Sequence, residues 1–253
     1  MIKIFNKEIP FYGVCFFVGI LISAIIAFVL LHKRKWDKFD FLCCIAYLLI
    51  GAILGAKLLF IAVSIDTIIE YNLSFIEIMK GGFVFYGGLL GGALGVFVYG
   101  KQFKLSSIKY MDLCATVLPL GHAMGRVGCF LSGCCYGIEY DGFLSHVYHS
   151  SSNVLTPLGV GLFPVQLLEA SLLLLLFVSL IIMWFKNVKT GKITVTYLIS
   201  YAIMRFSLEY LRGDSERGIL LGLSTSQWIS VLIVIAICIY YLIKYLKNKK
   251  ANN

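Results

Sequence analysis

The chain has 253 residues, of which 60% are hydrophobic and 14% are charged. Soluble domains carry about a quarter charged residues, so this composition excludes a soluble globular protein and predicts a polytopic membrane protein. The formal net charge of +9 would suit nucleic-acid binding. However, the positions of the basic residues indicate membrane topology instead, and we expect no nucleic-acid partner.

Seven apolar stretches follow one another along the chain, each of about 20 residues, the length that a helix needs to cross a membrane. No Pro/Ser-rich linker separates one stretch from the rest, so we expect a single polytopic membrane domain over residues 1–253. The predicted fold class is an all-α integral membrane protein with seven transmembrane helices. The predicted spans are 11–31, 42–65, 82–100, 110–132, 164–185, 193–212 and 225–245.

Lysine and arginine are distributed unevenly among the segments that join these spans. The first, third and fifth linkers hold four, three and three of them, and the tail from Lys244 onward holds four. The N-terminal segment and the other three linkers hold two, one, none and one. Because cytoplasmic segments carry the excess of Lys and Arg, the sequence predicts an N-terminus outside and a C-terminus in the cytoplasm. Residues 133–163 then form an extracytoplasmic loop.

Four basic residues remain, and all lie inside or at the edge of a span: Lys57, Arg126, Arg205 and Arg212. A charge at the centre of a spanning helix costs about 2.5–3.5 kcal/mol on insertion scales, so such residues usually face a polar interior. Arg126 has no acidic residue three or four positions away in its own helix, whereas His122 shares its face. This isolation makes Arg126 a candidate functional residue.

The sixth predicted span carries Arg205, Glu209 and Arg212 at positions i, i+4 and i+7, which would place them on one helical stripe. Guanidinium groups bind phosphate through a two-pronged hydrogen-bond geometry and keep their charge at any working pH. Several arginines facing one membrane-embedded cavity therefore predict a site for an anion, and a phospholipid headgroup suits a cavity that opens to the outer leaflet.

The third predicted span, GGFVFYGGLLGGALGVFVYG, is rich in glycine. Small residues four positions apart allow two helices to approach closely, and this reading applies to Gly91, Gly92 and Gly95. The pair Gly87–Gly88 follows Tyr86 directly, and we expect it to break the helix there.

The stretch GRVGCFLSGCCYG holds three of the eight cysteines: Cys129, Cys134 and Cys135. Zinc sites usually combine paired cysteines with a second cluster of ligands, and no second cluster exists here. We therefore predict no metal and no cofactor. A disulfide at the outer face and a reactive thiolate beside Arg126 remain as alternatives.

Several segments, in this order and spacing, resemble the bacterial phosphatidylglycerol–prolipoprotein diacylglyceryl transferases. Among them, GHAMGRVGCFLSGCCYG falls on the family signature G-R-x-G-N-F-x-N-x-E-x-x-G. The resemblance implies transfer of a diacylglyceryl group from phosphatidylglycerol to the lipobox cysteine thiol of a prolipoprotein signal peptide. Glycerol phosphate would leave, at the outer face of the bacterial plasma membrane. The other segments are FYGVCFF, LIGAILGAKLLF, GGFVFYGGLLGG, LFPVQLLEA and MRFSLEYLRGD.

The resemblance also implies roles for individual residues of this chain. The catalytic set is Arg126, Arg205, Tyr86 and Glu209, with the two arginines stabilising charge on the phosphodiester. The substrate-binding set is Tyr12, Lys57, Arg126, Gly137, Gln166, Glu169 and Arg212.

The chain departs from the family pattern at the residues expected to handle protons. Tyr86 stands in place of a histidine, Cys129 and Ser132 in place of two asparagines, and Cys134 in place of a glutamate. Two alternatives follow from these departures: a phospholipid-dependent transferase with a different acceptor, or a non-enzymatic relative that binds or moves lipid.

Overall fold

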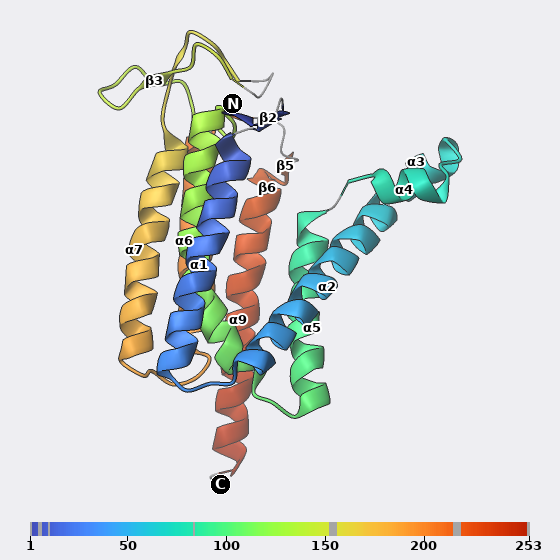
Figure 1. Ribbon diagram of the computed structural model, residues 1–253, viewed down its shortest axis with the longest axis vertical. Helices are drawn as coiled ribbons and strands as arrows, with labels where there is room; N and C mark the ends of the chain where they lie inside the picture. The colour runs from blue at the N-terminus through green and yellow to red at the C-terminus, as the bar shows by residue number, and fades with distance from the viewer. Residues whose placement is uncertain are drawn as a thin grey trace. The chain divides into compact units, whose positions relative to one another are not determined.

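The computed structural model describes residues 2–4, 7–9, 11–82, 84–151, 156–214 and 219–251, and it is dominated by helices (Figure 1). The chain forms two compact units: Met1–Ala27 with Cys114–Asn253, and Phe28–Leu113. Helices α1 and α6 each contribute to both units. The helices are α1 (Phe11–Lys33), α2 (Lys38–Val63), α3 (Ile65–Glu70), α4 (Phe75–Lys80), α5 (Phe85–Phe103), α6 (Ser107–Ser132), α7 (Val165–Phe185), α8 (Lys192–Leu208) and α9 (Thr225–Ala251).

The strands are short and form three antiparallel pairs. The pairs are β1 (Ile2–Ile4) with β2 (Lys7–Ile9), β3 (His146–Val147) with β4 (Gly161–Leu162), and β5 (Ile219–Leu220) with β6 (Leu223–Ser224).

Each of the seven predicted spans overlaps one long helix of the structure. Among the described residues, five helices are long and apolar enough to cross a membrane: α1, α2, α6, α7 and α9. Helix α8 has 17 residues, and glycines together with Lys101 and Gln102 dilute the apolar residues of α5. An all-helical membrane protein is therefore confirmed, whereas the count of seven spans and the orientation of the termini stay predictions.

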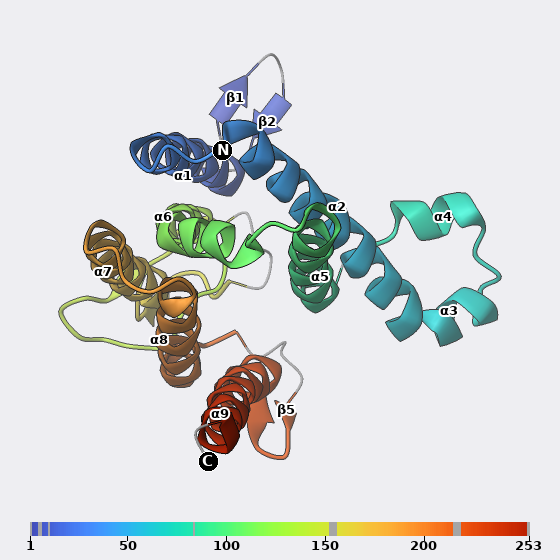
Figure 2. The same ribbon diagram turned by 90° about the horizontal axis from the view of Figure 1, so that it is seen from below.

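In the first unit, α8 packs against both α7 and α9, and the view along the helices places α8 between them (Figure 2). The basic α7–α8 turn and the C-terminus lie at one end of this unit (Figure 1). The loop after α6 and the β5–β6 hairpin lie at the other end. This separation agrees with the unequal distribution of lysine and arginine, because the basic segments share one end.

In the second unit, glycines bring α2 and α5 into backbone contact. A Cβ atom added to Gly91 would lie 2.1 Å from the carbonyl oxygen of Gly51, and one added to Gly87 would lie 2.2 Å from that of Gly55. The pairing is antiparallel, since the numbers fall along one helix as they rise along the other. Close packing at Gly91 is confirmed, but the predicted break at Gly87–Gly88 is wrong because both residues lie inside α5.

The predicted sixth span ends earlier than its sequence indicated. Helix α8 ends at Leu208 and a 3₁₀ turn follows over Glu209–Leu211, after which Arg212 has an extended backbone. The helical hydrogen bonds give way to bonds with the loop after α6, in which the Ile138 N–H donates to the Leu211 carbonyl at 3.0 Å. The predicted stripe is therefore wrong for Arg212, which leaves the helix before it could share a face with Arg205.

Candidate functional site: arginines and cysteines at the end of α6

Arg126 on α6 is paired with Glu169 on α7. Its Nε lies 3.0 Å from Glu169 Oε2, and the side chains are 15% and 2% exposed. Neither Arg126 Nε nor Glu169 Oε1 has a hydrogen-bond partner among the described residues, because the Nε–H is not directed at the neighbouring oxygen. The two side chains thus form an ion pair in which Arg126 Nε and Glu169 Oε1 make no hydrogen bond within the described residues.

His122 lies one helical turn before Arg126 and also faces Glu169. Its Nε2 is 3.8 Å from Glu169 Oε1, and its ring packs at 5.4 Å against that of Tyr201 on α8. The predicted shared face of His122 and Arg126 is therefore confirmed, and it is the face toward α7. A small apolar cluster from α6 and α7, formed by Ala123, Ala170 and Leu173, is buried beside them.

Arg205 and Glu209 form an ion pair in which both side chains are about nine-tenths buried. Arg205 Nη1 is buried and has no hydrogen-bond partner among the described residues. Arg205 and Arg126 both interact electrostatically with His122. Two buried guanidinium groups therefore lie around one imidazole, each with an unused N–H donor.

Arg212 is held by a partner that the sequence analysis did not single out. Its Nε and Nη2 donate to the two carboxylate oxygens of Asp214 at 2.9 and 2.8 Å. Burial disfavours the charged guanidinium, but the hydrogen bonds that it donates to Asp214 and to the neighbouring Cys135 sulfur raise the pKa of Arg212 above its ordinary value. The sequence places Asp214 two positions after Arg212, the spacing at which side chains lie on the same side of an extended backbone.

The backbone around Arg212 joins the loop after α6 to the end of α8. Gly137 pairs with Arg212 as an isolated β-bridge, and a Cβ atom at Gly137 would lie 2.3 Å from the Phe163 carbonyl oxygen. On α7, the buried Gln166 donates from Nε2 to the Cys134 carbonyl at 2.9 Å. Gly137 and Gln166 therefore position the loop beside the arginines.

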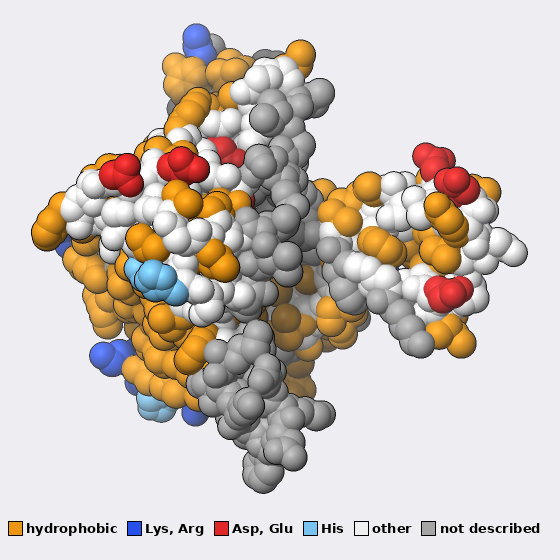
Figure 3. All heavy atoms as spheres, turned by 90° about the horizontal axis from the view of Figure 1, so that it is seen from above, with side chains coloured by type: hydrophobic (Ala, Val, Ile, Leu, Met, Phe, Trp, Pro, Cys, Tyr) orange, Lys and Arg blue, Asp and Glu red, His pale blue; other side chains and the backbone are white. Residues whose placement is uncertain are grey.

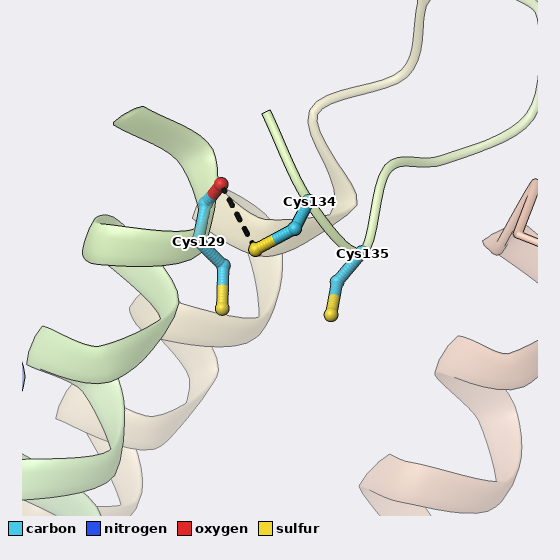
Figure 4. A group of neighbouring side chains, drawn as sticks. All are labelled: Cys129, Cys134 and Cys135. Carbon is cyan, nitrogen blue, oxygen red and sulfur yellow. Dashed lines mark hydrogen bonds between the residues drawn. The ribbon is translucent and has the colours of Figure 1, made fainter. Parts of the chain in front are cut away.

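The three cysteines of the signature stretch meet at this same place. Cys129 is in the last turn of α6, and the positive φ angles of Gly133 (+75°) and Cys135 (+56°) turn the chain back. Their three sulfur atoms lie within 4.8 Å of one another, and Figure 4 shows the Cys134 sulfur directed toward Cys129. Hydrogen bonds from the Cys129 and Cys134 thiols, and the charge of Arg212, lower the pKa of the Cys135 thiol.

Tyr12 brings α1 to the cysteines and Arg126. Its backbone N–H donates to Ser132 Oγ at 3.1 Å, and a Cβ atom at Gly128 would lie 2.9 Å from the Tyr12 Cα. The Tyr12 hydroxyl interacts electrostatically with Arg126 and with all three cysteines. Tyr12 is therefore part of the same group of residues.

Two of the predicted site residues are not placed at this site. Lys57 belongs to the second unit, where its Nζ donates to the carbonyls of Met79 and Gly81 at 3.1 and 3.0 Å and lies 4.8 Å from the centre of the Phe60 ring. The side chain of Tyr86 lies outside the described residues. The roles predicted for Lys57 and Tyr86 stay predictions.

The loop at this end of the first unit exposes apolar side chains as well as carboxylates (Figure 3). Phe143 is fully exposed. His149 is exposed and His146 is half-buried in β3, and the serine-rich tip at 152–155 lies outside the described residues. Tyr148 is buried and its hydroxyl donates to the Phe130 carbonyl at 3.0 Å, which fastens the loop to α6.

Comparison with known proteins adds an independent finding. Residues 1–243 match the family described as prolipoprotein diacylglyceryl transferase. The chain is 33% identical to the phosphatidylglycerol–prolipoprotein diacylglyceryl transferase 2 of Clostridium perfringens, over 98% of this chain and 96% of that protein. It is also 33% identical to the corresponding transferase of Clostridium tetani, over 98% of each chain. The transferase of Finegoldia magna is 31% identical, over 97% of this chain and 95% of that protein.

Proposed function

The chain belongs to the prolipoprotein diacylglyceryl transferase family, and we propose that it transfers the diacylglyceryl group of phosphatidylglycerol to a prolipoprotein. The acceptor is the lipobox cysteine thiol, and glycerol phosphate leaves. The reaction takes place at the outer face of a bacterial plasma membrane, which is the face predicted for the loop after α6 from the distribution of Lys and Arg. The names of the relatives and the full-length match support the substrates.

The observation that carries the proposal is the pair of buried guanidinium groups with unused donors, Arg126 Nε and Arg205 Nη1. A buried N–H without an acceptor costs free energy, and a bound phosphate oxygen removes that cost. Glu169 holds Arg126 in place and offsets its charge before the lipid binds. This arrangement suits an anionic headgroup that arrives with its own negative charge.

The reaction requires charge stabilisation on the phosphate and removal of the thiol proton. The acceptor sulfur forms a bond to the glycerol carbon of the diacylglyceryl group. The bond between this carbon and the phosphate oxygen breaks, its electron pair stays on that oxygen, and the P–O bond remains intact. Donors directed at the atom where charge develops are usually the largest catalytic contribution, and Arg126 and Arg205 supply them. Tyr12 lies near Arg126, and Gly137 pairs with Arg212.

The test is transfer in proteoliposomes that contain phosphatidylglycerol and a lipobox peptide. Arg126→Ala is expected to lower the rate by about 10²–10³-fold, the effect of removing one such donor. Lys189→Ala removes an exposed positive charge from the α7–α8 turn and is the matched control. Wild-type rates in Arg126→Ala would contradict the site assignment. Binding of phosphatidylglycerol by the wild type without any transfer would support a lipid-binding relative instead.

A further inference from the structure

The group formed by Cys129, Cys134 and Cys135 has the geometry of a thiolate metal site. Zinc binds cysteine sulfur at about 2.3 Å, so two sulfurs on one tetrahedral ion lie roughly 3.8 Å apart. Here the three sulfur atoms lie within 4.8 Å of one another, and small side-chain rotations would bring them to that spacing. The spacing along the sequence did not indicate this, because two of the ligands come from a loop that folds back on α6.

The backbone holds the three cysteines in place. The Cys134 N–H donates to the Cys129 carbonyl at 3.1 Å, which closes the turn after α6. The Gln166 side chain bonds the Cys134 carbonyl from α7. Such outer contacts orient the ligands of metal sites, and the contact from Gln166 comes from α7, which does not itself carry a cysteine.

The charges around the cysteines favour an anionic metal–thiolate group. Three thiolates and one Zn²⁺ carry a net charge of −1, and both Arg126 and Arg212 interact electrostatically with Cys135. Asp214 neutralises part of this positive charge by its two hydrogen bonds to Arg212. The surroundings are thus positive enough to stabilise the complex without a fourth protein thiolate.

Catalytic zinc sites have three protein ligands and one open position. Cys129 follows Arg126 by three residues on α6, which places the sulfur and the guanidinium on neighbouring positions of one face. A nucleophilic sulfur must approach the carbon that is bonded to the phosphate oxygen. An acceptor bound beside Cys129 would therefore be next to a phosphate bound by Arg126.

We infer that Cys129, Cys134 and Cys135 bind one Zn²⁺ ion, and that the open position takes the acceptor thiol of the transfer reaction. This inference rests on the function proposed above. It assigns the deprotonation of the acceptor thiol to the metal. A thiol that binds a metal ion is deprotonated outright, so no side chain has to act as the base.

The step balances without an oxidant or a reductant. The thiol proton passes to water when the acceptor sulfur binds the zinc. The zinc-bound thiolate then forms the S–C bond, the C–O bond breaks, and glycerol phosphate leaves with the electron pair. The resulting thioether is a weaker ligand than a thiolate, so it dissociates and the next acceptor thiol can bind.

The first experiment measures zinc by mass spectrometry in the full-length protein, purified in detergent with reductant and added Zn²⁺. We expect about one zinc per wild-type chain, and loss of it in Cys129→Ser, Cys134→Ser and Cys135→Ser. The control is Cys238→Ser, whose side chain is exposed on α9. Cobalt substitution should give thiolate charge-transfer absorption in the wild type and in the control.

Several outcomes would overturn the inference. They are a wild type without bound zinc, zinc bound equally by the Cys129→Ser and Cys135→Ser variants, and a disulfide between two of the three cysteines in protein prepared with zinc and without reductant. Because the cobalt spectrum reports the ligands of the wild type directly, it decides the question even where a serine variant fails to fold.

Transfer activity separates this inference from the proposed function. Chelation of the metal should lower the rate at least tenfold, and added Zn²⁺ should restore it. Full activity of the metal-free wild type would remove the zinc from the mechanism and leave the transferase intact. A zinc-loaded wild type that binds lipid without transferring it would contradict the proposed function, whereas the metal content would still stand.

Discussion

Arg126 on α6 lies 3.0 Å from Glu169 on α7, in a part of the protein where both side chains are largely buried. The two residues are 43 positions apart in the chain, and neither has an oppositely charged residue within four positions of its own helix. Each is therefore neutralised only by the packing of α6 against α7. This ion pair joins α6 to α7 and fixes the position of the Arg126 guanidinium.

Glu169→Gln should destabilise the protein strongly, because removing one partner of a buried ion pair leaves an uncompensated charge and costs about 3–5 kcal/mol. Replacing both partners, as in Arg126→Met with Glu169→Met, should recover much of this loss while transfer stays absent. Thermal unfolding in detergent measures the difference. Ser171→Ala is the control, since its hydroxyl bonds only a carbonyl of α7. A double variant less stable than either single variant would contradict the pairing.

Arg205→Lys should keep the positive charge beside Glu209 but lose the two-pronged donor geometry. A lysine ammonium cannot replace a guanidinium that binds phosphate at two oxygens, so we expect the transfer rate to fall by about 10²-fold with little change in unfolding temperature. Steady-state kinetics with phosphatidylglycerol checks this expectation. An unchanged rate would show that charge alone is sufficient at Arg205.

Gly91→Ala should prevent α2 and α5 from packing, because the added Cβ would lie 2.1 Å from the Gly51 carbonyl oxygen. Gly92→Ala is the matched control on the same helix, where the new Cβ would meet only ordinary contacts from 3.4 Å outward. Alanine also favours helix by about 0.4–1 kcal/mol at a compatible site, so Gly92→Ala should be neutral or stabilising. The yield of folded protein after membrane extraction distinguishes the two, and equal yields would contradict the close packing.

Tyr148 should make the loop after α6 sensitive to alkaline pH. Burial raises the pKa of Tyr148 to about 12, above the usual value of about 10. The neutral hydroxyl therefore contributes stability that is complete below about pH 10 and is lost as the pH rises through about 12. Tyr148→Phe removes the hydrogen bond to Phe130, at a cost of about 1 kcal/mol, and should abolish this pH dependence. The difference between the two alkaline absorbance titrations isolates the Tyr148 transition, and its absence would contradict the burial.

Tyr86→Phe tests the catalytic role that the resemblance to the family implies for Tyr86. If zinc deprotonates the acceptor thiol, this variant should retain most of the transfer rate of the wild type. A severe loss of rate with normal zinc content would restore Tyr86 to the mechanism as an acid or a base.

Much of the helical architecture could be predicted from hydropathy and length. The apolar stretches predicted helices in the right places because a membrane requires backbone groups to bond within one segment. The end of α8 could not be predicted in this way. Leu211 bonds to the loop residue Ile138, and that interaction is invisible to any local pattern around Arg212.

The sequence by itself identified Arg126 and Arg205 as the residues proposed to bind phosphate, because a charge inside an apolar span is costly. Only the tertiary structure decided their partners. Glu169 reaches Arg126 from another helix, and Asp214 pairs with Arg212 outside the expected stripe. Cys129 meets Cys134 and Cys135 through a turn with two positive φ angles. The physical reason is that burial cost depends on the residue type, whereas pairing depends on distances that arise only when helices and loops pack together.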